Sequence, residues 1–252
     1  MRIGFDLDGV LADLHYTFAR AALRLFPELD AGAVESPVVG ASPPEPDAAT
    51  DDAGSVEAVV PDAAAASTDF ALSRQQSMEI WDELCATENF WESLRETEPG
   101  IIRSLAEISD THGWETIFLT SRPRTAGRTV QRQSQRWLDR FGFPLPSVFV
   151  VHGSRGRIAD ALALDIVVDD RPENCLDVVL ESKARAVLIW RGPPDKIPGS
   201  ARRLGIGVEP TVQACLEVLV EAERAARTPA DFLRRLKGLL GLHTRPAKTS
   251  RR

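Results

Sequence analysis

The chain has 252 residues, with 30 Lys and Arg against 37 Asp and Glu and a formal net charge of −7. No run of about 18 apolar residues occurs, and Asp6 and Asp8 break the apolar start, so we expect neither a membrane-spanning helix nor a signal peptide. Three widely spaced cysteines without a CxxC pair exclude a disulfide framework and a structural zinc site, and they suit the reducing cytoplasm, where we expect the protein.

The chain begins with a predicted strand and a predicted helix. Arg2 to Phe5 form a short apolar run that stops at a carboxylate pair and Gly9, a pattern typical of a buried strand that ends in a polar loop. Residues 16–26 show helical periodicity, with Phe18, Ala21, Ala22 and Leu25 on one face. We therefore expect a strand–loop–helix unit at the N-terminus.

The next segment carries the negative charge of the chain. From Glu28 to Asp69 there are ten acidic residues and no Lys or Arg, so the rest of the chain is mildly basic, which fits an anionic ligand. Residues 30–67 are rich in Ala, Pro, Asp, Gly and Ser, and they show neither an aromatic residue nor a convincing period. We predict a disordered acidic insertion over 30–67.

The remaining elements alternate between helix and strand. Helices are predicted at 73–86 with Ser73 as the N-cap, and at 101–110, 125–141, 155–163 and 212–225. Strands are predicted at 116–119, 148–151, 165–168 and 187–190. Short loops between alternating strands and helices predict an α/β fold, a Rossmann-like parallel sheet with helices on both faces.

Polar side chains follow three of these strands at the point where each strand ends. They are Asp6 and Asp8 after the first strand, Thr120 and Ser121 after the second, and Asp169 with Asp170 after the fourth. Because ligands of open parallel sheets bind beyond the carboxyl ends of the strands, we expect these residues to meet in one site.

Four carboxylates at one site indicate a cation. Two charges 4 Å apart repel by about 4 kcal/mol at an effective dielectric constant of 20, so the cluster needs partial protonation or a bound metal. Oxygen donors without nearby His or Cys favour Mg²⁺ over zinc. A metal-binding carboxylate can attack phosphorus and form an aspartyl-phosphate, while a second carboxylate transfers the proton.

In this order and at this spacing, the motifs DxDGVLAD, LTSRP and VDDRPEN resemble the haloacid dehalogenase-like (HAD) superfamily phosphatases over roughly 1–30 and 70–220. With Asn89-Phe90-Trp91, they resemble the 5'(3')-deoxyribonucleotidase branch of that superfamily. The resemblance implies a small helical cap inserted after the first strand, onto which the acidic insertion alternatively folds. It also implies a core at 1–14 and 100–228, a cap at 15–99, and a C-terminal helix with a basic tail at 229–252.

The resemblance also implies roles for individual residues. Asp6 would be the nucleophile and a Mg²⁺ ligand, and Asp8 would be the general acid/base and bind Mg²⁺ through its backbone carbonyl. Thr120 would donate a hydrogen bond to the phosphate. Asp169 would bind Mg²⁺, and Asp170 would support the water shell of the metal. Substrate contacts would come from Ser121, Arg122, Phe90 and Trp91. Two alternatives remain open: Arg122 as a surface ion pair, and Phe90 and Trp91 as core residues.

The chain departs from the family at the third motif, which is normally a lysine. No Lys lies between Glu115 and Glu181, and the candidates in its place are Arg155 and, second, Arg157. An arginine also holds phosphate, through two parallel hydrogen bonds. We therefore expect Arg155 to complete the catalytic set, with an effect on the rate more than on the kind of reaction.

The predicted function is a Mg²⁺-dependent phosphomonoester hydrolase, a 5'-nucleotidase acting on (deoxy)nucleoside monophosphates. The alternatives are a phosphatase for another small phosphate ester and a weakly active scaffold that binds partners through its tails. From Phe232 to Arg252 there are seven Lys and Arg and no acidic residue. We expect a short packed helix with a basic tail there and no specific nucleic-acid binding; a homodimer is left open.

Overall fold

The computed structural model describes residues 1–29, 72–225 and 229–240. The predicted acidic insertion over 30–67 and the basic tail beyond Leu240 lie outside the described residues. No helix in the described part of the chain has the length and apolar character needed to cross a membrane.

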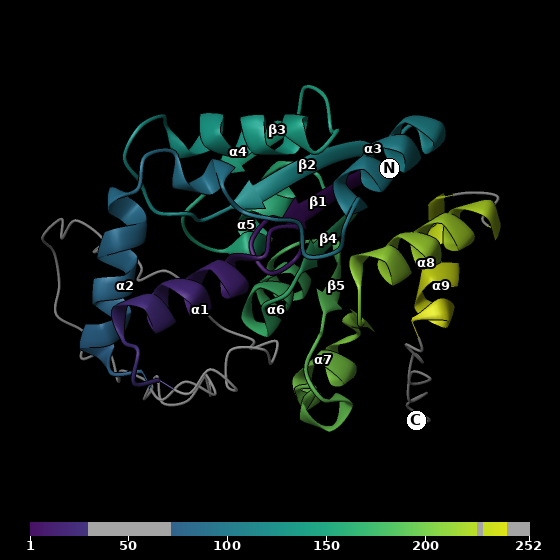
Figure 1. Ribbon diagram of the computed structural model, residues 1–252. Coiled ribbons are helices and arrows are strands. Elements are labelled where there is room, and N and C mark those ends of the chain that lie inside the picture. The colour runs from purple at the N-terminus through teal and green to yellow at the C-terminus, as the bar shows by residue number, and fades with distance from the viewer. Residues whose placement is uncertain (30–71, 226–228, 241–252) are drawn as a thin grey trace, which may run out of the picture.

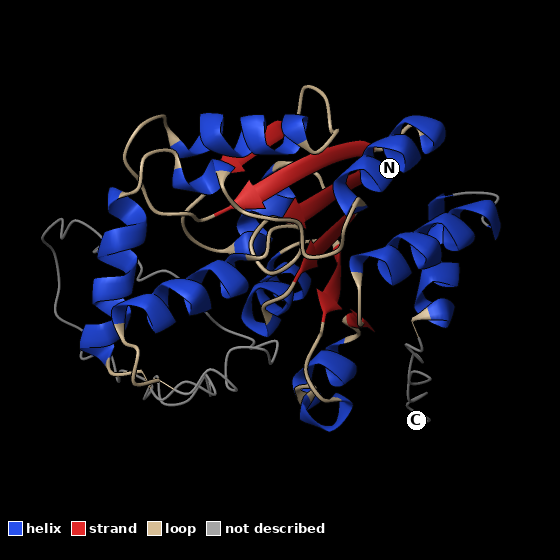
Figure 2. Ribbon diagram, viewed as in Figure 1, coloured by secondary structure: helices blue, strands red, loops and turns tan. Residues whose placement is uncertain are grey.

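A parallel sheet of six strands forms the centre of the molecule (Figure 2). The strands are β1 (Arg2–Asp6), β2 (Glu115–Thr120), β3 (Ser147–Val150), β4 (Ile166–Asp169), β5 (Arg185–Ile189) and β6 (Gly207–Glu209). Their order across the sheet is β3-β2-β1-β4-β5-β6, so β1 lies between β2 and β4. This order places the carboxyl ends of β1, β2 and β4, which carry the polar residues of the predicted site, next to one another.

Helices follow and precede these strands (Figure 1). They are α1 (Leu14–Leu25), α2 (Arg74–Ala86), α3 (Ile101–His112), α4 (Val130–Arg140), α5 (Arg155–Ala161), α6 (Pro172–Glu181), α7 (Gly199–Leu204), α8 (Val212–Ala225) and α9 (Pro229–Leu239), with short 3-10 turns η2 (Phe90–Glu92) and η3 (Pro194–Lys196). As predicted, α2 begins after Ser73, whose side chain forms a capping box with Gln76.

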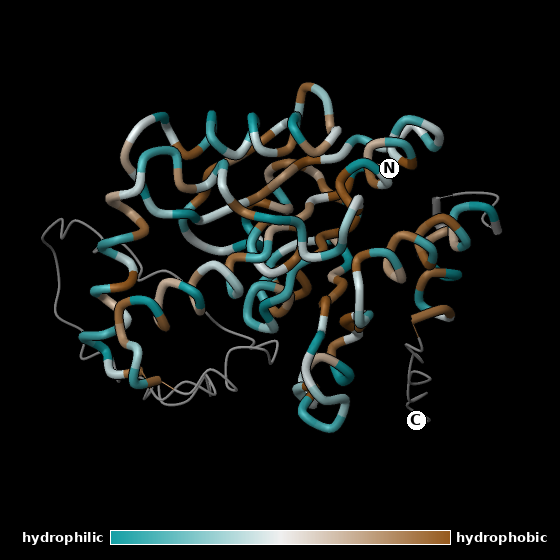
Figure 3. The backbone as a smooth tube through the Cα atoms, viewed as in Figure 1, coloured by the Kyte–Doolittle hydropathy of each residue, from teal (hydrophilic) through white to brown (hydrophobic). Residues whose placement is uncertain are grey.

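Alternating strand residues build two cores, one on each face of the sheet. On one face, Phe5, Phe118 and Val168 pack with residues of α3, α4, α8 and α9. On the other face, Leu119 and Val167 pack with residues of α5, α6 and α7. Figure 3 shows hydrophobic residues along the central strands and α8. The predicted Rossmann-like α/β fold is therefore confirmed.

The structure differs from the sequence-based elements in two places. The helix predicted over 125–141 begins only at Val130, because the side chain of Thr129 caps it by accepting the Arg132 N–H. Residues 121–129 are instead the loop that follows β2. In addition, α6, α7 and β6 lie where no element was predicted, and the last two are too short to show a period.

Candidate active site

The carboxyl ends of β1, β2 and β4 bring the predicted site residues together. Asp6 is the last residue of β1 and lies opposite Leu119, which directly precedes Thr120. Asp169 is the last residue of β4, on the other side of β1. All three polar side chains are buried; Asp6 keeps 7% of its surface exposed. This edge of the sheet is therefore the candidate active site.

Arg155 joins the two buried carboxylates. Its Nη2 donates to Asp6 Oδ1 at 2.8 Å, and its Nε lies 3.6 Å from Asp169 Oδ2. Arg157 points away from the site, with 83% of its side chain exposed and its Nε 3.9 Å from Glu181. Of the two candidates for the missing lysine, the structure thus brings Arg155 to the carboxylates.

The start of α5 explains how Arg155 reaches the site. Ser154 caps this helix, because its Oγ accepts the N–H groups of Gly156 and Arg157 at 3.1 and 3.3 Å. A Cβ on Gly156 would lie 2.2 Å from the Asp177 carbonyl oxygen of α6, so only glycine permits this close approach of the two helices. The capped, tightly packed helix start directs Arg155 toward β1 and β4.

Asn174 fixes Asp169, a contact to which the sequence analysis assigned no role. Its Nδ2 donates to both carboxylate oxygens of Asp169 at 3.0 Å, and the Arg171 N–H donates to Oδ1 at 2.9 Å. Asn174 lies in the first turn of α6, within the motif VDDRPEN. Its place five residues after Asp169, behind a helix-starting proline, is the signal that could have revealed it.

Asp170 lies against the loop that carries Asp8. Gly9 has a φ of +80°, and a Cβ there would lie 1.9 Å from Asp170 Oδ2, so any other residue would be both strained and obstructed. The loop therefore passes directly over the Asp170 carboxylate, as expected if both belong to one site.

Arg191, which the sequence analysis did not identify, holds the same loop from the end of β5. Its guanidinium donates to the carbonyls of Gly9 and Val10, and Nη2 lies 3.0 Å from Glu98 Oε1. Glu98 also accepts the Val212 N–H at the start of α8, at 2.7 Å. A single arginine after an apolar strand gave no distinctive sequence signal.

Burial disfavours the ionised form of the three carboxylates Asp6, Asp169 and Asp170. It raises the pKa of Asp6 well above its usual range, and Asp169 raises it further while Arg155 lowers it. Burial likewise raises the pKa of Asp169, against the opposing effect of Arg155. Burial and the neighbouring Asp169 raise the pKa of Asp170 to about 8. Arg155 opposes this effect at Asp6 and Asp169, and Arg191 opposes it at Asp170, but the pKa of all three carboxyls stays raised.

The residues present fit a magnesium ion in donor type and charge. Asp6, Asp169 and Asp170 offer hard oxygen donors that lack a full complement of positive charge. Within the described residues, no three Asp, Glu, His or Cys side chains are already gathered at metal-binding separation. Arg155 instead lies between two of the carboxylates. Binding a metal there requires these side chains to adjust.

Arg122, Phe90 and Trp91 are predicted to contact the substrate, but all three side chains are buried. Arg122 forms an ion pair with Asp8, but its guanidinium is buried, so the alternative of a surface ion pair is only partly met. Phe90 and Trp91 are also buried, and they pack edge to face with their ring centroids 4.8 Å apart. Their burial does not support stacking on a substrate; they are core residues. Ser121 is half-buried, and its substrate contact stays a prediction.

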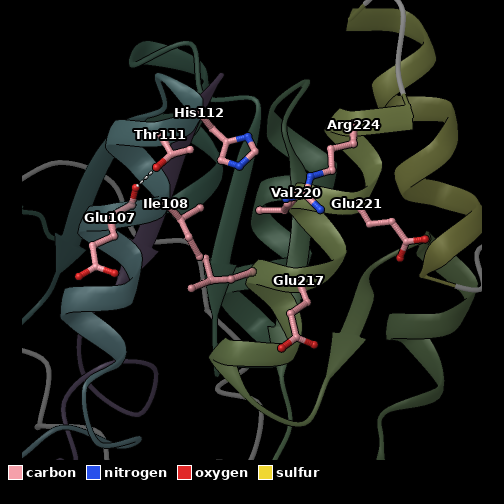
Figure 4. Close-up of a pocket in the computed structure, with 9 residues that line it drawn as sticks. Glu107, Ile108, Thr111, His112, Glu217, Val220, Glu221 and Arg224 are labelled. Carbon is pink, nitrogen blue, oxygen red and sulfur yellow. Dashed lines mark hydrogen bonds between the residues drawn. The ribbon is translucent and has the colours of Figure 1, made fainter.

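A separate groove of about 610 Å³ lies between α3 and α8 (Figure 4). Its lining includes Glu107, His112, Glu217 and Val220, and none of the predicted site residues. The C-terminal end of α3 leads into the start of β2, so this groove lies toward the amino ends of the strands. It is therefore distinct from the site at the carboxyl ends.

The pKa of Asp170 predicts a pH-dependent stability of the metal-free protein. An unfolded Asp loses its proton near pH 4, whereas folded Asp170 keeps it until about pH 8, so the folded state binds more protons in between. The free energy of unfolding should therefore fall as the pH rises from about 4 to about 8. Denaturant titrations in EDTA measure it, and Mg²⁺ should reduce the fall because it stabilises the ionised carboxylates.

The matched control for this prediction is Asp170→Asn. Asparagine does not ionise, so the fall in stability between about pH 5 and about pH 8 should be smaller than in the wild type. An equal fall in both proteins would contradict the assignment of the pH dependence to Asp170.

No protein-family model and no curated protein matches the sequence. Among solved structures, the chain is similar to a HAD family hydrolase from Deinococcus radiodurans R1 that holds bound phosphate and sodium. The TM-score is 0.53, with 14% identity over 88% of this chain and 95% of that one. A hydrolase from Pseudomonas syringae gives a TM-score of 0.44, with 17% identity over 90% of this chain and 100% of that one. The first of these comparisons shows that the chain shares the fold of a HAD family hydrolase.

Proposed function

We propose that the protein is a phosphomonoester hydrolase in which Asp6 is the nucleophile. The observation that carries this proposal is the buried Asp6 carboxylate at the end of the central strand, held by Arg155 and adjacent to Asp169. A carboxylate fixed by one hydrogen bond keeps a second oxygen available for attack. The shared fold with a phosphate-holding HAD family hydrolase supports the same function.

The proposed reaction has two displacements at phosphorus. A carboxylate oxygen of Asp6 attacks the phosphorus, the bond to the ester oxygen breaks, and the leaving alkoxide takes a proton from Asp8. A water molecule then attacks the aspartyl-phosphate and gives a proton back to Asp8. The bond between phosphorus and Asp6 breaks, which releases inorganic phosphate and restores the Asp6 carboxylate and the protonated Asp8.

Arg155, Thr120 and a bound metal ion would each stabilise the substrate phosphate in a different way. Arg155 would contact the phosphoryl oxygens while it orients Asp6. The Thr120 hydroxyl group would donate a hydrogen bond to the phosphate. A bound Mg²⁺, held by Asp6, Asp169 and the Asp8 carbonyl and supported by Asp170, would reduce the repulsion between Asp6 and the substrate phosphate.

The proposed substrates are small phosphate esters, with deoxynucleoside monophosphates first among them. In the proposed domain organisation, the core comprises 1–14 and 100–228, and the segment 15–99 is a cap. Its described helices α1 and α2 pack together, with the rings of Phe18 and Trp81 centred 5.5 Å apart. A cap beside the strand ends would restrict the site to small substrates.

The proposal is tested by phosphate release. We expect turnover of 4-nitrophenyl phosphate with Mg²⁺ and none after treatment with EDTA. A panel of deoxynucleoside monophosphates, ribonucleoside monophosphates and sugar phosphates then ranks the substrate classes by kcat/KM. A wild-type protein that releases no phosphate from any of these compounds with Mg²⁺ would overturn the hydrolase proposal. Activity confined to sugar phosphates would overturn only the nucleotidase specificity.

A further inference from the structure

The side chain of Arg122 is fully buried, and the proposed reaction as described so far assigns no role to this residue. Its exposed side-chain fraction is 0%, against 20% for its partner Asp8. Burying a guanidinium costs several kcal/mol unless a partner with good geometry compensates the lost hydration. The contacts of Arg122 therefore indicate what this arrangement achieves.

Arg122 holds Asp8 by both carboxylate oxygens. Its Nε donates to Oδ1 and Oδ2 at 3.1 and 2.9 Å, and its Nη2 donates to Oδ1 at 2.8 Å. Such a two-pronged contact fixes the rotation of the carboxylate as well as its position. Oδ1 accepts two of these bonds and Oδ2 one, so Oδ2 retains capacity for a proton.

Arg122 is itself fixed from several sides. Its Nη1 donates to Ser134 Oγ at 2.9 Å. Its guanidinium carbon lies 4.7 Å from the Trp91 ring centroid and 5.7 Å from that of Trp137. Cations bind the faces of such rings favourably, and more strongly where water is excluded.

Each of the two indole rings is anchored by its own N–H group. Trp91 Nε1 donates to the Pro123 carbonyl at 3.0 Å, and Trp137 Nε1 donates to the Leu94 carbonyl at 2.8 Å. Since both rings are buried, neither can turn without breaking its hydrogen bond. The walls around Arg122 are therefore rigid.

We propose that Arg122 is a positioning residue that holds the Asp8 carboxylate for proton transfer to the leaving oxygen of the substrate. The inference rests on the proposed function. Trp91, Trp137 and Ser134 act through Arg122, which explains why the aromatic residues are buried near the site without reaching the substrate. A lysine in place of Arg122 would keep the charge and lose the two-pronged contact.

The role of Arg122 is visible in the dependence of the rate on the leaving group. An alkoxide needs a proton from Asp8 as the ester bond breaks, whereas 4-nitrophenolate leaves without one. A displaced Asp8 should therefore lower kcat/KM, which covers the steps up to departure of the leaving group, far more for alkyl phosphates than for aryl phosphates. A residue needed only for folding would slow both substrates in the same proportion.

The experiment compares Arg122→Lys with the wild type on 4-nitrophenyl phosphate and on an alkyl phosphate, with Mg²⁺. We expect kcat/KM on the alkyl phosphate to fall about 100-fold and kcat/KM on the aryl phosphate to change less than about fivefold. Arg124→Lys, an exposed position in the same loop, is the matched control and should leave both rates unchanged.

A double-mutant cycle with Asp8→Asn tests whether Arg122 acts through Asp8. In the Asp8→Asn background, Arg122→Lys should change kcat/KM on the alkyl phosphate less than about twofold. If Arg122→Lys does not fold, Ser134→Ala carries the same comparison, because it removes only the Nη1 contact.

The failures of the two proposals are distinguishable. A wild type inert on both substrates and on the nucleotide and sugar phosphates overturns the hydrolase, and with it the role of Arg122. An active wild type whose Arg122→Lys variant loses kcat/KM on both substrates by the same factor overturns the positioning role and leaves the hydrolase intact. Additive effects in the double-mutant cycle also overturn the positioning role.

Discussion

Replacing Asp6 by asparagine is expected to abolish phosphate release, with a fall in kcat of about 10⁴-fold or more. The amide oxygen is a poor nucleophile and cannot form the aspartyl-phosphate. It can still accept the hydrogen bond that Arg155 donates to Asp6 Oδ1, so the site should keep its shape. Because burial raises the pKa of Asp6, removing this ionisable group should leave the melting temperature unchanged or raise it.

The control for Asp6→Asn lies in the same motif. Asp13 caps α1, because its Oδ1 accepts the Tyr16 N–H at 3.0 Å, and it pairs with Arg95. Asp13→Asn should therefore leave kcat within about threefold, since an asparagine also caps a helix. Mass spectrometry of acid-quenched protein should find phosphate on Asp6 in the wild type. Full activity in Asp6→Asn would exclude Asp6 as the nucleophile.

The sequence was sufficient to predict the sheet and the meeting of its polar ends. The strand runs at 2–5, 116–119 and 165–168 are each followed directly by a polar residue, and parallel strands place their carboxyl ends at one edge. This rule depends on strand direction, which the alternation of strands and helices indicates, whereas the order of the strands is known only from the structure. The structure accordingly places Asp6, Thr120 and Asp169 together.

Side-chain conformations could not be predicted in the same way. Whether Arg122 binds a substrate or Asp8 depends on rotamers and on rings from distant segments, such as Trp91 and Trp137. The interpretation of Phe90 and Trp91 as substrate contacts followed the family resemblance, whereas their burial agrees with the alternative, that they are core residues. Sequence spacing alone does not determine burial of an aromatic pair outside a periodic element.

The choice between Arg155 and Arg157 shows where a local rule would have helped. Residues two apart on a helix point to nearly opposite sides, so only one of them can face the sheet. The small residue Gly156 and the cap Ser154 mark the helix start, but the side that faces β1 depends on how α5 packs against α6. That packing is a tertiary property.

Arg155→Ala is expected to impair both stability and catalysis. It removes the cation between Asp6 and Asp169, and breaking one side of a buried ion pair typically costs about 3–5 kcal/mol. Burial raises the pKa of both carboxyls, so protonation should relieve part of this cost at low pH and less of it at about pH 8. Denaturant titrations at about pH 5 and about pH 8 measure the difference.

Comparing Arg155→Ala with Arg155→Lys separates the contribution of the positive charge to catalysis from that of the guanidinium shape. Arg155→Ala should lower kcat/KM by about 10³-fold, because both the orientation of Asp6 and the contact with phosphate are lost. Arg155→Lys restores an ammonium group and should recover activity to within about tenfold of the wild type. Arg157→Ala, at the exposed position two residues later, should change stability by less than about 0.5 kcal/mol and activity by less than about twofold. Loss of activity in Arg157→Ala together with an active Arg155→Ala would reverse the assignment. Arg155 would then be a structural counter-ion for Asp6 and Asp169, and the phosphate would have to be held by another cation.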